Sequence, residues 1–158
     1  MNAALGAQRT RAALALPVLA RFDSPAARVL MVAIGLQESR FIHREQVGGP
    51  ARGFWQFELG GVRGVLNHPV SQDLARALCR ARGAPPTPSG VYTRLAADDL
   101  LAAGFARLLL LTDPRPLPPP DNLPAGWDYY LRNWRPGKPH PGSWPACHAA
   151  AVAALETP

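Results

Sequence analysis

Apolar residues along the chain recur at helical rather than strand spacing, most clearly between residues 24 and 40. Ser24 supplies the side-chain oxygen of a helix N-cap, and Pro25 suits the first helical position. The apolar positions that follow are Ala26, Val29, Leu30, Ala33, Ile34 and Leu36. This pattern predicts an apolar, largely buried helix that ends near Arg40.

Proline and glycine divide the rest of the chain into short segments. Loops are predicted at 42–53 and 83–90, and six prolines between Asp113 and Pro124 predict an extended strap rather than a flexible linker. Pro17 disturbs the end of the first helix. The other predicted elements are helices at 2–16, 71–82, 91–112, 124–134 and 142–156, a short helical turn at 53–58 and a further segment at 60–69.

The composition agrees with an all-α architecture. Ala and Leu together number 48, whereas Val, Ile and Thr together number 16. Helices favour the first pair and strands favour β-branched residues, so a β-sandwich or barrel is disfavoured. A chain of 158 residues has room for one core. We therefore expect one all-α domain that spans residues 1–158.

The charge is basic: 17 Lys and Arg residues against 11 Asp and Glu residues give a net charge of +6, and sixteen of the cations are Arg. Such a surface suits an anionic partner, such as nucleic acid, a membrane surface or an acidic wall polymer. A GC-rich genome would explain the Arg excess equally well. The cations are scattered, so no nucleic-acid-binding arm is predicted.

Other site types have little support in the sequence. Cys79 and Cys147 lie far apart, with no metal-ligand spacing among the cysteines and four histidines, so no metal or cofactor is expected and a disulfide stays open. No apolar run reaches the roughly 20 residues that span a bilayer. Residues 9–20 loosely mimic a secretory signal, but the apolar stretch is short, and we interpret it as part of the first helix.

The strongest chemical signal lies at the end of the apolar helix, in the segment 36–41 (Leu-Gln-Glu-Ser-Arg-Phe). Apolar surroundings raise the pKa of a carboxyl group, which allows a Glu to stay protonated near neutral pH and act as a general acid. Glu38 is therefore a candidate catalytic residue. The alternative is a solvated Glu38, or one paired with Arg40 or Arg44.

A second signal follows at 53–57 (Gly-Phe-Trp-Gln-Phe), which places an amide and three aromatic rings in one turn. Aromatic faces stack on the C–H faces of sugar rings, and a Gln amide bonds to their hydroxyls. Phe54, Trp55 and Gln56 are accordingly candidate substrate-binding residues. The alternative is that the aromatic rings belong to the core.

Together the two segments resemble the soluble lytic transglycosylase and goose-type lysozyme superfamily. Its pattern is a helix-ending Glu-Ser-x-Phe followed by Gly-Leu-Met-Gln. Residues 38–41 match the first part, and 53–56 match the second with Phe-Trp in place of Leu-Met, at a Glu38-to-Gln56 separation of 18 residues. The resemblance covers roughly residues 25–58.

The family's later Ala-Tyr-Asn-Ala-Gly element, whose Tyr contacts the catalytic Glu, does not occur in this chain. Tyr130, in the aromatic segment 127–134, could supply that hydroxyl, although its spacing equally suits core packing. The segment that follows, 135–140 (Arg-Pro-Gly-Lys-Pro-His), indicates a rigid basic loop that touches substrate or a plain surface turn.

The resemblance implies that Glu38 protonates the β-1,4 glycosidic oxygen between N-acetylmuramic acid and N-acetylglucosamine in peptidoglycan. Ser39 would orient Glu38 or contact substrate; the alternative is that, as a helix-end Ser, it only caps the backbone. A lytic transglycosylase needs one carboxylate and forms a 1,6-anhydro product, which is the reaction we favour. A hydrolase usually recruits a second carboxylate, for which Glu58 and Glu45 are candidates, with Asp73 further away. Each could instead pair with a nearby Arg.

We therefore expect a monomeric, single-domain lysozyme-like enzyme, all-α, acting on peptidoglycan glycan strands without a cofactor, nucleic acid or membrane span. Its setting would be a phage or prophage: made in the host cytoplasm and acting on the periplasmic wall, or carried in a virion. One alternative is a non-catalytic lysozyme-like structural or wall-binding module of a phage particle. Another is a basic helical nucleic-acid binder.

Overall fold

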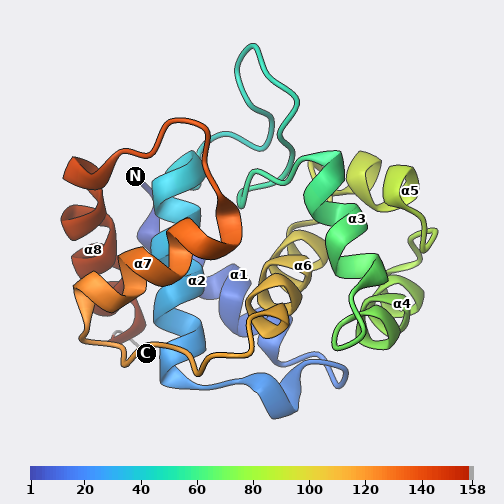
Figure 1. Cartoon of the computed structure of the whole chain (residues 1–158), viewed down its shortest axis with the longest axis horizontal. Helices are drawn as coiled ribbons and strands as arrows, with labels where there is room; N and C mark the ends of the chain where they lie inside the picture. Colours follow the sequence, from blue (N-terminus) through green and yellow to red (C-terminus); the bar gives the residue numbers. More distant parts are fainter. Residues whose placement is uncertain (157–158) are drawn as a thin grey trace.

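Helices form nearly all of the regular structure in the computed structural model, which describes residues 1–156 (Figure 1). Within these residues there is no strand, only the isolated bridges Glu45–Arg52 and Arg52–Phe57. The all-α prediction is confirmed. The elements are α1 (Ala3–Leu14), η1 (Ala20–Phe22), α2 (Pro25–Ser39), α3 (Leu59–Asn67), α4 (Gln72–Arg82), α5 (Pro88–Arg94), α6 (Asp99–Thr112), α7 (Leu123–Trp134), η2 (Pro141–Ser143) and α8 (Trp144–Glu156).

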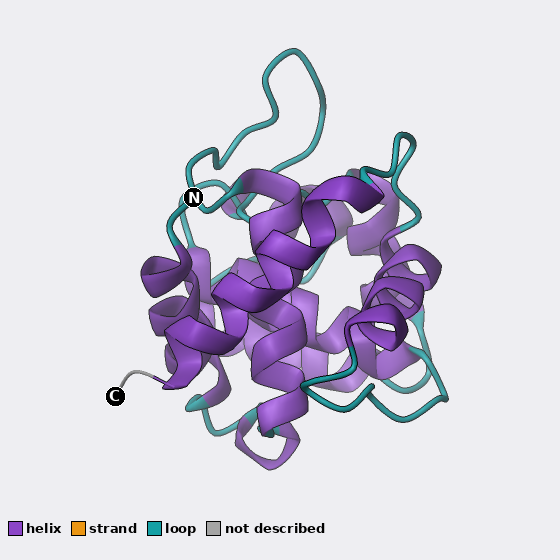
Figure 2. Ribbon diagram, turned by 90° about the vertical axis from the view of Figure 1, so that its left-hand side faces the viewer, coloured by secondary structure: helices purple, strands orange, loops and turns teal. Residues whose placement is uncertain are grey.

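Helix α6 joins two groups of helices. On one side it packs against α1 and α2, which α8 also contacts, and on the other it packs against α3 and α4. Figure 1 shows α7 crossing α2 on the first side, and α5 beside α3 on the second. Figure 2, turned by 90°, shows the loops outside the helical body, of which the longest projects well away from it. One contiguous apolar core lies beneath all of these helices.

Helix α2 is the central element, and it forms as predicted. The Ser24 hydroxyl oxygen accepts the N–H of Ala27 at 3.1 Å, and Pro25 occupies the first turn. Its side chains are buried almost all around, from Ala27 to Leu36. A helix that is apolar on every side is stable only when surrounded, so α1, α6 and α8 pack around it.

The single helix predicted over 91–112 is wrong, because two helices, α5 and α6, occupy that stretch. The break lies at Asp98, whose backbone is extended and whose Oδ1 accepts the N–H groups of Leu100 and Leu101 at 3.1 and 2.9 Å. An aspartate that satisfies two free N–H groups starts a new helix at that point. The two consecutive aspartates, at positions 98 and 99, were the feature of the sequence that could have predicted this second helix start.

The helical turn predicted at 53–58 is also wrong. Arg52 and Phe57 exchange two backbone hydrogen bonds of 2.9 Å, so the four residues between them form a tight hairpin-like turn. Gly53 and Gln56 both have positive φ, 74° and 50°. Only Gly adopts that region without steric cost, which explains Gly53 at the first of these positions.

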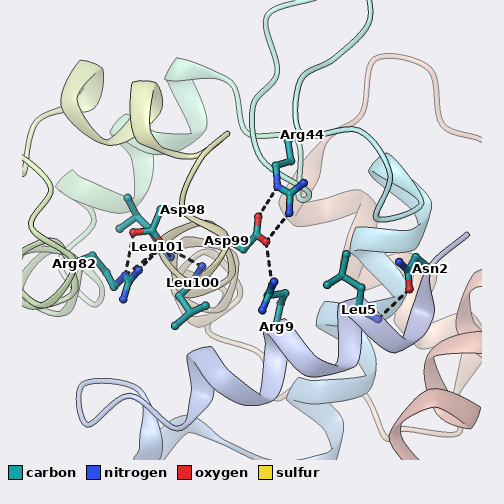
Figure 3. Close-up of polar contacts among 9 residues, drawn as sticks. All are labelled: Asn2, Leu5, Arg9, Arg44, Arg82, Asp98, Asp99, Leu100 and Leu101. Atoms are coloured by element: carbon teal, nitrogen blue, oxygen red, sulfur yellow. Dashed lines mark hydrogen bonds and ion pairs between the residues drawn. The ribbon is translucent and has the colours of Figure 1, made fainter.

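Consecutive aspartates at the start of α6 bind cations on two sides (Figure 3). Asp98 receives two hydrogen bonds of 3.0 Å from Arg82 of α4. The Asp99 carboxylate accepts hydrogen bonds from Arg9 of α1 at 3.0 Å and from Arg44, in the loop after α2, at 2.9 Å. The base of the 42–53 loop is therefore fixed to α6 and α1 by a largely buried carboxylate.

Two further features considered from the sequence are a disulfide bond and a membrane-spanning helix. Cys79 and Cys147 are both buried and both free thiols, so the disulfide left open by the sequence does not form. None of the helices within residues 1–156 combines the length and apolar character needed to cross a membrane.

The chain leaves α2 through a sharp reversal that returns an aromatic ring to the core. Arg40 and Phe41 both adopt left-handed backbone conformations, with φ of 57° and 51°. The Phe41 ring then lies between Gly6 of α1 and Gly35 of α2, where an added Cβ would meet it at 2.3 and 2.2 Å. These two helix glycines are required by the close approach of the ring.

We predict that Gly35→Ala lowers the free energy of unfolding by about 1–3 kcal/mol, because the new methyl group overpacks the Phe41 ring. Gly64→Ala is the matched control: nothing lies within 4 Å of an added Cβ there, so alanine should stabilise α3 by about 0.5–1 kcal/mol. Urea unfolding of both variants measures the difference. Equal effects of the two substitutions would contradict the packing argument.

Candidate active site

A cleft of about 840 Å³ opens between the end of α2, the segment before α3, and α7 with the loop that follows it. Its walls combine polar and apolar groups, and they include polar side chains from all three regions. These polar residues are Gln37, Glu38, Gln46, Gln56, Glu58, Tyr130, Asn133, Arg135, Lys138 and His140. The two predicted motif segments therefore each contribute to one hollow.

Glu38 is the half-buried carboxyl of this cleft, in the last turn of α2. Burial raises its pKa from 4.5 to about 7, and a hydrogen bond from Tyr130 opposes part of that rise. Among the described residues no cation forms an ion pair with Glu38, and Arg44 binds Asp99 instead. The alternative in which Glu38 pairs with Arg40 or Arg44 is therefore wrong.

Tyr130 of α7 donates its hydroxyl hydrogen to Glu38 Oε1 at 2.7 Å. Its ring stacks on Trp144 of α8, with centroids 5.5 Å apart and planes within 10°, and Trp127 packs against both rings. Burial and the neighbouring Glu38 carboxylate raise the pKa of Tyr130, so it stays a hydrogen-bond donor. Tyr130 thus occupies the position beside Glu38 for which the sequence made it a candidate.

Two tryptophan N–H groups hold the motif turn between α2 and α7. Trp55 Nε1 donates to the backbone oxygen of Met31 in α2 at 2.8 Å. Trp134 Nε1 of α7 donates to the backbone oxygen of Trp55 at 2.9 Å. Trp55 is thus bonded to both helices, so the 53–56 turn sets the spacing between α2, which carries Glu38, and α7, which carries Tyr130.

The prediction that Phe54 and Trp55 contact substrate is wrong. Their exposed fractions are 1% and 0%, and neither lines the cleft. Both rings pack edge-on against Phe41 with centroid distances of 5.3 Å. The core alternative is the correct one, because burying these rings stabilises the turn that positions Gln56.

Ser39 also lies outside the cleft lining and is buried. Its Oγ donates to the backbone oxygen of Gly35 and accepts the N–H of Phe41, both at 3.1 Å. The hydroxyl therefore satisfies backbone groups at the reversal after α2. Ser39 supports the helix end that carries Glu38 and does not reach a substrate in the cleft.

Gln56 does line the cleft. Its side-chain nitrogen donates to the backbone oxygen of Gly53 at 2.8 Å and, more weakly, to that of His43 at 3.4 Å. These bonds tie the turn to the chain leaving α2. The side chain therefore holds the cleft wall together while part of it borders the hollow.

The structure separates the two candidate second carboxylates. Glu58 is exposed and lines the cleft at the start of α3, where its side chain forms no capping bond. Glu45 does not line the cleft. Its side chain is largely exposed, and its Oε1 lies 3.8 Å from Arg52 Nε. Asp73 is on α4 and pairs with Arg76. Only Glu58 of these three can face a ligand beside Glu38.

Among the polar residues of the cleft, neither Gln37 nor Gln46 nor Asn133 was singled out from the sequence. Gln37 precedes Glu38, and Asn133 lies within the aromatic segment 127–134. Their places beside a candidate catalytic residue and within a candidate cleft segment could have indicated that they line the cleft. Gln46 lies in a loop, and nothing in its sequence context indicates which way it points.

Comparisons with known proteins add no relative: no family model, no curated protein and no solved structure matches the chain. Within residues 1–156, no group of three His, Cys, Asp or Glu side chains is arranged to hold a metal ion.

We predict that Glu38→Gln is more stable than the wild type above pH 7, by about 2–3 kcal/mol, and equally stable below pH 4.5. In the wild type the unfolded carboxyl ionises near 4.5 and the folded one near 7, so the free energy of unfolding falls as pH rises through this window. Urea unfolding from pH 4 to 9 measures it.

Glu58→Gln is the control for that experiment, because it removes one negative charge from an exposed position at the same cleft. A Glu38→Gln variant whose stability follows the wild type across the whole pH range would contradict the burial of the Glu38 carboxyl.

Proposed function

We propose that this protein cleaves the β-1,4 glycosidic bond between N-acetylmuramic acid and N-acetylglucosamine in peptidoglycan, with Glu38 as the general acid. The observation that carries the proposal is a half-buried carboxyl whose pKa is raised to about 7, on the wall of an open cleft and hydrogen-bonded to a tyrosine. The motif resemblance adds the lysozyme-like family and a phage-type, wall-opening role to the proposal.

In the first step the protonated Glu38 carboxyl donates its hydrogen to the glycosidic oxygen, and the bond from that oxygen to C1 of the muramic sugar breaks. A pKa near 7 keeps a useful fraction protonated at neutral pH. The Tyr130 hydroxyl then stabilises the carboxylate that remains, because it donates to Oε1.

We favour the transglycosylase route for the second step. The Glu38 carboxylate takes the hydrogen of the C6 hydroxyl, O6 bonds to C1, and the 1,6-anhydro ring closes without consuming water. One carboxylate suffices for this route, so it does not depend on Glu58, the second carboxylate that lines the cleft. A hydrolase would need Glu58 to position water.

The decisive variant is Glu38→Gln, which keeps the shape and loses the transferable proton. We expect clearing of purified peptidoglycan by the wild type and a loss of about 10²–10⁴-fold in the variant. A zymogram and a turbidity assay measure it, with Arg63→Gln on the exposed face of α3 as the control. Normal clearing by Glu38→Gln would overturn the site assignment. Wild-type protein that binds the wall without cleaving it would identify a non-catalytic module.

The products distinguish the two enzymatic routes. We expect Glu58→Gln to retain most of the activity, because the transglycosylase route does not use a second carboxylate. Mass spectrometry should show that the products of both proteins lack one water relative to hydrolysed muropeptides. Hydrated products together with an inactive Glu58→Gln variant would indicate a hydrolase instead.

A further inference from the structure

The chain between α7 and α8 forms one edge of the cleft and carries several basic groups. Arg135, Lys138 and His140 all border the hollow. Neither Arg135 nor Lys138 forms an ion pair within residues 1–156, in contrast to the arginines that bind Asp98 and Asp99. Their positive charge is therefore not neutralised by the protein. We call residues 135–143 the basic loop.

The basic loop also lines a second hollow, of about 480 Å³. It shares Gln37 and His140 with the main cleft and adds Arg40, the exposed residue that directly follows α2. Arginine or lysine residues thus border both hollows. The carboxylates that line these hollows are Glu38 and Glu58, in the main cleft.

The basic loop is fixed relative to Glu38 by the neighbouring side chain. Gln37 Nε2 donates to the backbone oxygen of His140 at 3.0 Å, and the Ser143 hydroxyl donates to Gln37 Oε1 at 3.0 Å. Three prolines, at 136, 139 and 141, further restrict the loop backbone. A restricted loop loses little conformational entropy when a ligand binds.

We propose that the basic loop binds carboxylate groups carried by the glycan strand, so that the site selects an acidic glycan over a neutral one. This inference rests on the proposed function and names the substrate feature that the cleft edge recognises. Unpaired cations beside a sugar-binding cleft attract carboxylates, and neutral chitin-type strands offer none. In peptidoglycan the carboxylates come from the lactyl group of the muramic sugar or from the peptide stem.

Binding by the non-cleaving Glu38→Gln protein tests the proposal, with and without Arg135→Gln and Lys138→Gln together. The three ligands are a chito-oligosaccharide, peptide-free peptidoglycan strands and peptide-bearing strands. We expect the loop substitutions to weaken binding of carboxylate-bearing strands about fivefold to tenfold and to leave the chito-oligosaccharide unaffected. A loss with both acidic ligands indicates the lactyl group, and a loss with peptide-bearing strands alone indicates the stem.

The matched control is Arg63→Gln with Arg80→Gln, which removes the same net charge from exposed positions on α3 and α4 that border neither hollow. Equal weakening by the control pair, equal weakening for the neutral ligand, or unchanged binding of the acidic strands would overturn the inference alone. No binding of any glycan by any protein would overturn the proposed function together with it.

A second measurement avoids substitution altogether, because Lys138 is the single lysine of the sequence. Amine-reactive acetylation can then modify only Lys138 and the amino terminus, which serves as the internal standard. Carboxylate-bearing strands should slow acetylation of Lys138 severalfold relative to the amino terminus, and the chito-oligosaccharide should not. Equal rates at Lys138 with both ligands, by mass spectrometry, would overturn the proposal.

Discussion

The hydrogen bond from Tyr130 to the Glu38 carboxyl is the contact on which the arrangement of the cleft depends. A carboxyl at the end of an apolar helix is costly to ionise unless a donor faces it, and here the donor comes from a helix 92 residues further along the chain. Helix α7 must therefore cross α2 at one place. The stack of Tyr130 on Trp144 and the bonds through Trp55 fix that crossing.

The aromatic residues of the second motif act as supports rather than as ligand surfaces. The Trp55 ring N–H donates a hydrogen bond to α2, and its backbone oxygen accepts one from α7, so the buried Trp55 fixes the distance between these two helices. Phe41 occupies the space left by two glycines and packs against Phe54. Phe54 and Trp55 therefore face the core, and the cleft wall of this turn is formed by its neighbour Gln56.

Charge is used in two distinct ways. Asp98 and Asp99 bind three arginines from distant segments and hold the start of α6 against α4, α1 and the 42–53 loop. These cations are neutralised and contribute to the architecture. At the edge of the cleft, by contrast, Arg135 and Lys138 of the basic loop form no ion pair with any of residues 1–156. A net charge of +6 is thus a poor guide by itself, because its consequences depend on which cations are already paired.

Local pattern determined the helices and the candidate acid. The N-cap at Ser24, the apolar run of α2 and the Glu at its end are readable because they depend on neighbours within one or two helical turns. Helix α6 began later than expected, since the Asp98 cap outweighed the continuous Leu and Ala content. Only the tertiary structure decided that Tyr130 meets Glu38, that Phe54 and Trp55 are buried, and that Glu58 rather than Glu45 borders the cleft. Each of these depends on contacts between segments far apart in the chain, which no local pattern encodes.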